Sequence, residues 1–336
     1  MQLPVRAHAK PCLCRSKVAD VAAIGVSLWS SSEVVAHKLA GFDGTAIEPG
    51  APILVVGDDW AARVKTFLQG LSPVERDEVK ATGVSPDGTW QAWNAVSAAT
   101  FMERQNSPWL PRVLNDNAMF PYYQPIIEME TGRTIAFEAL MRANVDGRLI
   151  SGGELVDAAR AHNALFQFDQ KARTRAITHA ADRVLPGELL FVNFTPMVIY
   201  DPAICLQTTW EAAQAAGWRM DKLVFEVVES EAFPDIPHLR HILDAYRARG
   251  CTVALDDIGT GHTALSYIEE LRPDIIKIAK GLLPDRPHPD DLGLVRGLVE
   301  HAHNRGITAL IEGAVSYTHL RAHETKANLV CRLLLE

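Results

Sequence analysis

The sequence predicts an α/β fold, in which a small mixed α/β domain precedes a larger barrel of alternating strands and helices. From Pro121 onward, short and nearly continuous apolar strand candidates alternate with amphipathic helical stretches. This is the pattern of a mainly parallel sheet that is covered on both faces. The number of strand–helix units favours a (β/α) barrel over a doubly wound sheet.

The composition limits the class of protein further. The chain has 336 residues, of which 48% are hydrophobic and 22% are charged, and its formal net charge is -8. These ordinary values exclude a disordered, collagen-like or coiled-coil chain. The acidic balance argues against a binder of nucleic-acid polymers, and no apolar run is long enough to span a bilayer. We interpret the stretch Val18–Leu28, which Asp20 interrupts, as a first helix or strand rather than a signal peptide, and we expect a cytoplasmic protein.

Residues 1–115 are predicted to form the N-terminal domain. Pro52–Val56 is a short apolar strand candidate, and Ala61–Leu71 has helical periodicity. Ser72 is a helix N-cap that Glu75 completes as a capping box, and Pro86–Gly88 is a turn. Because no catalytic constellation is present, a regulatory domain and a structural extension stay open as alternatives.

The barrel region opens with a hairpin. Tyr122–Met129 and Thr134–Leu140 are strand candidates joined by a tight turn at Thr131–Gly132, which predicts one antiparallel strand at the start of the barrel. The later strand candidates are Leu189–Phe194, Leu223–Val228, Thr252–Leu255, Ile275–Ile278 and Thr308–Ile311. The helical stretches between them include Gly153–Arg183, His238–Arg249 and Leu292–Arg305, and Gly250 and Gly306 are placed as C-terminal caps.

Polar residues lie within or at the ends of these strand candidates. They are Glu138, Asn193, Glu226, Asp256, Asp257, Lys277 and Glu312. The ends of successive strands converge on one mouth of a barrel, so several carboxylates would share a small volume and repel one another. A hard cation such as Mg²⁺ or Mn²⁺, which prefers oxygen ligands, would relieve this repulsion. Such a site can activate water for attack on phosphorus.

Each motif alone is weak. Glu138-Ala139-Leu140 is a tripeptide that occurs in many helices, Asp256–Gly261 suits an ordinary strand-to-loop turn, and Lys277 suits a surface strand. Their joint order and spacing favour a shared site over these separate structural interpretations.

From about residue 118 to residue 313, the chain resembles the EAL domain, the cyclic di-GMP phosphodiesterase family. The matching segments are Tyr123–Ile126, Glu138–Leu140 with Arg142, Asn193–Pro196, Glu226–Glu229, Asp256–Gly261, Pro273–Lys277 and Glu312–Gly313. The resemblance implies a modified (β/α)₈ TIM-like barrel with an antiparallel first strand, and hydrolysis of cyclic di-GMP to linear pGpG.

The resemblance also implies a role for each matching residue. Metal ligands would be Glu138, Asn193, Glu226 and Asp256, with Asp257 serving a second metal or the following loop. Lys277 would orient the attacking water, and Glu312 would complete the catalytic cluster. Gln124, Leu140 and Arg142 would contact the substrate. Glu229 would brace the loop after Asp257, through which a homodimer is possible.

Three positions depart from the family pattern. Val228 stands where the family usually has Thr, Ile258 where it has Phe, and Ala279 where it has Asp. The second departure is a tolerable apolar exchange, whereas the third removes a carboxylate from the metal neighbourhood. A degenerate EAL domain that binds cyclic di-GMP or a partner protein without hydrolysis therefore stays open beside the phosphodiesterase. A nuclease acting on DNA or RNA is a distant third alternative, because no basic groove is visible.

The segment 314–336 resembles translated sequencing adapter. Val315–Thr325 and Leu329–Glu336 match two parts of one adapter in the same frame, with a gap of suitable length between them. We therefore interpret 314–336 as an artefact rather than evolved protein, and its residues His319, His323 and Glu324 as no metal site. A barrel that ends at Gly313 is expected to lack its last strand and helix and to leave two unpaired strand edges. We therefore expect the 336-residue chain to be poorly stable and inactive.

Overall fold

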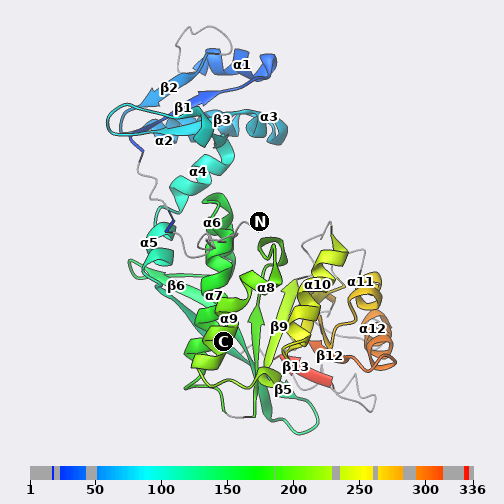
Figure 1. Ribbon diagram of the computed structural model, residues 1–336. Coiled ribbons are helices and arrows are strands. Elements are labelled where there is room, and N and C mark those ends of the chain that lie inside the picture. The colour runs from blue at the N-terminus through cyan, green and yellow to red at the C-terminus, as the bar shows by residue number, and fades with distance from the viewer. Residues whose placement is uncertain are drawn as a thin grey trace, which may run out of the picture. The chain divides into compact units, whose positions relative to one another are not determined.

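The computed structural model describes residues 17–18, 23–42, 51–185, 187–228, 235–259, 264–282, 293–312 and 329–332. The chain forms two compact units (Figure 1). The N-terminal unit comprises Lys17–Ala118 together with Gly153–Leu165, and the barrel unit comprises Met119–Gly152 and the chain from Phe166 onward. Within the described residues, no helix combines the length and apolar character that crossing a membrane requires.

The N-terminal unit contains a four-stranded antiparallel sheet in the order β2-β1-β3-β4. Its strands are β1 (Gly25–Trp29), β2 (Ile53–Val56), β3 (Lys80–Val84) and β4 (Val96–Ser97). Its helices are α1 (Glu33–Ala40), α2 (Trp60–Gln69), α3 (Pro73–Glu78), α4 (Ala98–Asn106), α5 (Leu110–Asn115) and α6 (Gly152–Ala161). The predicted capping box is confirmed, since Ser72 and Glu75 exchange side-chain to backbone hydrogen bonds at the start of α3.

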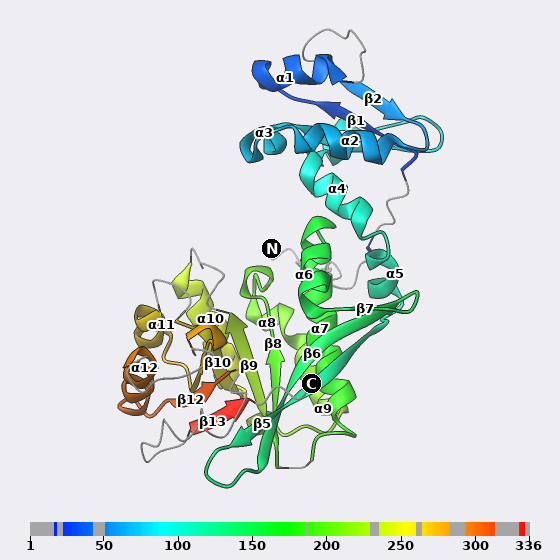
Figure 2. The same cartoon turned by 180° about the vertical axis from the view of Figure 1, so that it is seen from behind.

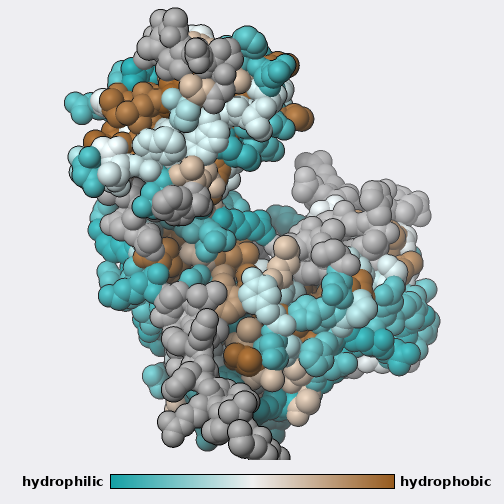
Figure 3. Space-filling view, turned by 45° about the horizontal axis from the view of Figure 1, so that its top comes forward, coloured by the Kyte–Doolittle hydropathy of each residue, from teal (hydrophilic) through white to brown (hydrophobic). Residues whose placement is uncertain are grey.

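One face of this sheet packs against helices and the other is partly exposed. The buried core joins residues of β1, β2 and β3 to α1, α2 and α4, including Val26, Val35 and Phe101. Leu54 and Val56 alternate with the buried residues of β2 and are exposed. Figure 3 shows apolar surface gathered on this unit. The mixed α/β character predicted for this part of the chain is confirmed.

The barrel unit consists of strands that are mostly parallel. They are β5 (Met119–Glu128), β6 (Thr134–Val145), β7 (Arg148–Ile150), β8 (Leu189–Asn193), β9 (Leu223–Val228), β10 (Thr252–Ile258), β11 (Ile275–Ile278), β12 (Thr308–Ile311) and β13 (Leu329–Arg332). Parallel pairing runs from β6 through β8, β9, β10 and β11 to β12. β5 pairs antiparallel with β6 after a tight turn in which Gly132 has a φ of 70°, so the predicted opening hairpin is confirmed (Figure 2).

Helices follow most of the strands and cover the outside of the sheet (Figure 1). They are α7 (Leu165–Ala180), α8 (Pro202–Cys205), α9 (Gln207–Ala215), α10 (Ile236–Arg247), α11 (Ala264–Leu271) and α12 (Gly293–His303). The stretch Gly153–Arg183, predicted as one helical segment, is two helices, because Asn163 adopts a φ of 53° between α6 and α7. Gly250 and Gly306 have φ values of 86° and 71°, as expected of residues that end helices.

The expectation of two unpaired strand edges was wrong. β13 lies between the edges, pairing parallel with β12 and antiparallel with β5. With the β5–β6 pairing, strands β5, β6 and β8 to β13 therefore form a continuous circuit, and β7 pairs with β6 outside it. Strand edges present unpaired N–H and C=O groups, which main-chain pairing with an added strand satisfies regardless of that strand's origin.

The inside of the barrel is filled by one layer of apolar side chains. The layer consists of Ile126, Ala136, Phe191, Val224, Ala254, Ile275 and Leu310, each from a different strand. A barrel of this size holds packed side chains rather than a pore. This layer is the floor on which the polar site is built.

Candidate active site

Each of six polar residues lies two positions beyond a residue of the apolar floor, five of them on the same strand and Glu312 directly after the end of β12. The pairs are Ala136 with Glu138, Phe191 with Asn193, Val224 with Glu226, Ala254 with Asp256, Ile275 with Lys277, and Leu310 with Glu312. Side chains two apart on a strand point to the same face. The six side chains therefore project into the barrel just above the floor, as the sequence predicts.

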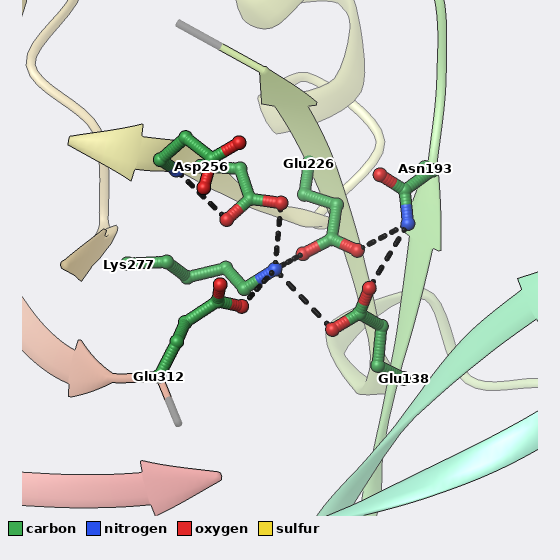
Figure 4. A network of polar contacts seen from close by, with 7 residues as sticks. Glu138, Asn193, Glu226, Asp256, Lys277 and Glu312 are labelled. Carbon is green, nitrogen blue, oxygen red and sulfur yellow. Dashed lines mark hydrogen bonds and ion pairs between the residues drawn. The ribbon is translucent and has the colours of Figure 1, made fainter. Parts of the chain in front are cut away.

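Lys277 is the centre of this group (Figure 4). Its Nζ lies 2.8 Å from both Glu226 Oε2 and Asp256 Oδ2, 3.2 Å from Glu312 Oε1 and 3.3 Å from Glu138 Oε2. The Lys277 side chain is fully buried. An ammonium group with three protons thus faces four carboxylates contributed by four other strands or strand ends.

Asn193 joins two of the carboxylates on the other side. Its Nδ2 donates to Glu226 Oε1 at 2.6 Å and to Glu138 Oε1 at 3.3 Å. Figure 4 shows the Asn193 amide nitrogen and the Lys277 ammonium nitrogen both in contact with Glu226 and Glu138. The amide oxygen of the same side chain is an oxygen donor of the kind that Mg²⁺ and Mn²⁺ accept.

The electrostatics of the site reflect its burial. Burial, followed by the neighbouring Glu138, raises the pKa of Glu226 well above its ordinary value. Burial also raises the pKa of Asp256 to about 6, against the lowering effect of Lys277. Burial alone would lower the pKa of Lys277, but Glu226 and the other carboxylates outweigh it and raise that pKa well above its usual range. Lys277 therefore stays charged. Its single positive charge does not balance the four carboxylates that surround it.

Asp257 adds a second group of possible ligands. Oxygens of Asp256, Asp257 and Glu312 lie within 4.8 Å of one another, as do oxygens of Glu138, Glu226 and Asp256. Asp257 has a φ of 57°, and the pairing of β10 with β11 shifts register between Leu255 and Ile258. A bulge of this kind re-aims side chains, and here it lets two consecutive aspartates share a site.

The residues assigned to substrate contact lie on the same face of the hairpin. Gln124 is directly opposite Glu138 in the β5–β6 register, and Leu140 and Arg142 are two and four residues beyond Glu138. At the rise of a strand, these positions are about 7 and 13 Å from Glu138 along β6. The Arg142 guanidinium lies 5.6 Å from the centre of the Tyr122 ring. The residues assigned to substrate contact therefore extend along the hairpin face that carries Glu138, away from the acidic cluster.

Two further sets of positions named from the family resemblance are the loop residues after β9 and β10 and the departure at Ala279. Glu229 and residues 260–263 of the loop after Asp257 lie outside the described residues, as does the side chain of Val228. Ala279 is buried and its backbone N–H donates to Ile258 O at 3.2 Å. This position, two residues after Lys277, therefore contributes no carboxylate to either group.

The donor set fits a divalent cation. Four carboxylates converge on the Lys277 ammonium group, and Asp257 is grouped with two of them. Glu226 Oε2 is buried without a hydrogen bond, its contact being the ion pair with Lys277. A hard cation would supply the missing positive charge, and carboxylate and amide oxygens are its preferred ligands.

The sequence patterns did not predict one buried polar group, the Asp169–Arg173 pair of α7. Its signal is two opposite charges four residues apart on an apolar helix face.

Comparison with known proteins decides the family. The profile of the EAL domain family matches residues 108–324, which is more than half of the chain. This chain belongs to the EAL domain family. The match runs past Gly313 into the segment that resembles translated adapter. The EAL fold thus accounts for the antiparallel first strand and the modified TIM-like barrel.

Similar EAL proteins include enzymes and ligand complexes. The chain is 26% identical over 189 residues to cyclic di-GMP phosphodiesterase NbdA of Pseudomonas aeruginosa, covering 55% of this chain and 24% of NbdA. A standalone EAL protein of Vibrio cholerae bound to cyclic di-GMP has a TM-score of 0.58 and 26% identity, covering 64% of this chain and 89% of that one. The manganese and cyclic di-GMP complex of Klebsiella pneumoniae BlrP1 also has a TM-score of 0.58 and 26% identity, covering 65% and 55%. The chain spans less than half the length of the curated relatives that it matches.

Proposed function

We propose that this EAL domain hydrolyses one phosphodiester bond of cyclic di-GMP to give linear pGpG, and that it requires Mg²⁺ or Mn²⁺. The observation that supports this most directly is the convergence of Glu138, Glu226, Asp256 and Glu312 on Lys277 at one end of the barrel. The names of the similar proteins, one a phosphodiesterase and two bound to cyclic di-GMP, point to the same substrate.

The roles of the residues follow from their positions. Glu138, Asn193, Glu226 and Asp256 would hold the first metal, and Asp257 would contribute to a second. A bound divalent cation would lower the pKa of an attacking water and neutralise charge on the phosphate. Lys277 would orient the water through its ammonium protons, and Glu312 would keep that ammonium group in place. Gln124, Leu140 and Arg142 would position the substrate, with Arg142 suited to a phosphate oxygen.

Several sequence expectations stay proposals. They are a bracing role for Glu229, a homodimer formed through the loop after Asp257, a regulatory role for residues 1–115, and a cytoplasmic location. An assembly-state measurement by light scattering, with and without cyclic di-GMP, tests the homodimer.

A second function is favoured by one observation. Ala279, two residues after Lys277, is buried at the position where the resemblance implies a carboxylate. Weakened binding of a second metal would leave a domain that binds cyclic di-GMP without turnover. The two functions differ in one measurable respect, because a receptor has no hydrolysis to lose.

The test is hydrolysis of cyclic di-GMP in the presence of Mg²⁺ or Mn²⁺, with pGpG measured by chromatography. Glu138→Ala should abolish turnover, whereas Glu130→Ala, an exposed glutamate of the same hairpin, should leave it unchanged. Binding of cyclic di-GMP without turnover by the folded, metal-loaded protein would support the receptor. Absence of both binding and turnover would reject both functions.

We further propose that the 336-residue chain is less active than a second form of the protein. In that form, residues 314–336 are replaced by the residues that the source DNA encodes after position 313. The same assay compares the two forms at equal concentration. Equal turnover would contradict this proposal and show that β13 replaces the native strand adequately.

A further inference from the structure

A buried ion pair lies outside the acidic cluster, on helix α7. Arg173 Nε donates to Asp169 Oδ2 at 2.9 Å, and each side chain is only 2% exposed. Removing two charges from water costs several kcal/mol for each ion, and packed apolar residues at such positions are often as stable or more so. The burial of this pair therefore needs a reason other than stability.

The other oxygen of Asp169 connects the pair to strand β8. Asp169 Oδ1 accepts a hydrogen bond from the backbone N–H of Thr195 at 2.7 Å. Thr195 is two residues after Asn193, where β8 ends. The N–H of Phe194 donates to Glu226 O at 3.1 Å. The hydrogen bond from the Thr195 N–H to Asp169 therefore fixes the next peptide group along the chain.

Arg173 is itself held from its far side. Its Nη1 donates to the hydroxyl of Thr209 on α9, and Thr209 is fully buried. A continuous series of polar contacts thus runs from α9 through Arg173 and Asp169 to the backbone that follows Asn193. The carboxylate cannot move without breaking contacts with both α7 and the chain after β8.

This connection matters because the contacts of Asn193 with the acidic cluster depend on the exact position of its side chain. Its amide nitrogen lies 2.6 Å from Glu226 and 3.3 Å from Glu138, and rotation or displacement of the side chain would remove it from the ligand group. Hydrogen bonds that orient metal ligands typically change metal affinity or activity 10–100-fold when they are removed.

We propose that Asp169 is a positioning residue, which fixes the backbone after β8 and thereby holds Asn193 in the geometry that binds the metal. Arg173 and Thr209 keep the Asp169 carboxylate aimed at the Thr195 N–H. The inference rests on the proposed function in one respect, namely that Asn193 is a metal ligand.

A matched pair of double variants tests the role of the oxygen alone. Asp169→Asn with Arg173→Met removes both buried charges but keeps an acceptor for the Thr195 N–H. Asp169→Leu with Arg173→Met removes the charges and the acceptor, and keeps a similar volume. The readout is Mn²⁺ affinity of the full chain, measured by isothermal titration calorimetry, with thermal unfolding as a check that each variant is folded.

The asparagine variant should bind Mn²⁺ within about threefold of the unmodified chain, and the leucine variant about 10–100-fold more weakly. A purely structural role predicts no difference between two folded variants, and equal affinities would overturn the proposal. If the unmodified chain binds no Mn²⁺, the proposed metal-dependent function fails instead. Turnover adds a second readout, in which kcat at subsaturating metal should fall more than KM for cyclic di-GMP rises.

If the leucine variant does not fold, hydrogen exchange in the unmodified chain replaces it. The Thr195 amide, bonded to a buried carboxylate, should exchange at least about 100-fold more slowly than an exposed amide in the metal-free protein. Exchange of the Thr195 amide at the rate of an exposed amide, in an otherwise protected barrel, would equally overturn the proposal.

Discussion

The ammonium nitrogen of Lys277 lies 2.8 Å from Glu226 Oε2 inside the barrel, and both side chains are completely buried. Glu138 and Asp256 share the same lysine, at 3.3 and 2.8 Å. In the absence of a metal, Lys277 is therefore the main source of positive charge that makes this buried acidic cluster tolerable.

Replacing Lys277 by Met should destabilise the metal-free protein strongly. The variant leaves buried carboxylates without their ion-pair partner, which typically costs about 3–5 kcal/mol. Urea unfolding at pH 8 with a chelator measures the change in the free energy of unfolding. Mn²⁺ should reduce the difference between the variant and the unmodified chain. A Met variant as stable as the unmodified chain in chelator would show that the carboxylates are already neutral there.

Metal binding should raise stability through the same carboxylates. At a free Mn²⁺ concentration of 100 times its dissociation constant, the free energy of unfolding should rise by about 2.7 kcal/mol. Glu226→Gln should remove most of this increase, since it replaces a ligand oxygen, whereas Glu300→Gln on the exposed side of α12 should retain it. Denaturation with and without Mn²⁺ measures the shift, and an unchanged shift in Glu226→Gln would contradict its assignment as a ligand.

Ala279→Asp distinguishes the two proposed functions. The added carboxylate is buried near the acidic cluster, so the metal-free protein should lose on the order of 1–3 kcal/mol. With Mn²⁺ present, turnover should rise about tenfold or more if a second metal limits hydrolysis. Metal stoichiometry and pGpG production measure both effects, with Ala279→Ser as the control for size. Unchanged turnover would mean that position 279 does not limit the reaction.

Val330→Pro tests whether β13 holds the barrel together. Val330 pairs with Leu310 of β12 and with Glu128 of β5, and proline has no N–H to donate to such a ladder. The urea midpoint should fall, whereas Val330→Thr keeps the N–H and should change it little. Equal midpoints for the proline and threonine variants would show that pairing of β13 contributes nothing to stability.

Cys251 provides a pH-dependent prediction. Burial raises the pKa of its thiol from 9.0 to about 12, against the lowering effect of Arg249. Between these values the folded protein keeps a proton that the unfolded chain releases, so the stability contributed by this thiol is complete below pH 9 and is lost as the pH rises to 12. At pH 8.5 the thiolate fraction should be about a thousandfold lower in the folded state. Alkylation followed by mass spectrometry measures it, and labelling of Cys251 at the unfolded rate would contradict the prediction.

Much of the barrel and its site is readable from local pattern. The alternation of apolar strands and helices requires only periodicity, and polar residues at strand ends require only that parallel strands share an orientation. The split between α6 and α7 was not predicted, because the left-handed conformation of Asn163 leaves little trace in hydrophobic periodicity. The pairing of β13 was also not predicted, since strand pairing depends on which edges are free in three dimensions.

The sequence by itself determined which residues could reach the barrel mouth, because a two-residue repeat sends Glu138, Glu226 and Lys277 to the inner face of their strands. Only the tertiary structure decided what each of them contacts. Closing the sheet brought the Lys277 ammonium group between carboxylates from distant strands, and packing α7 against β8 aimed Asp169 at the Thr195 N–H. These relationships join residues far apart in the chain, and their geometry follows from how strands and helices pack rather than from any local pattern.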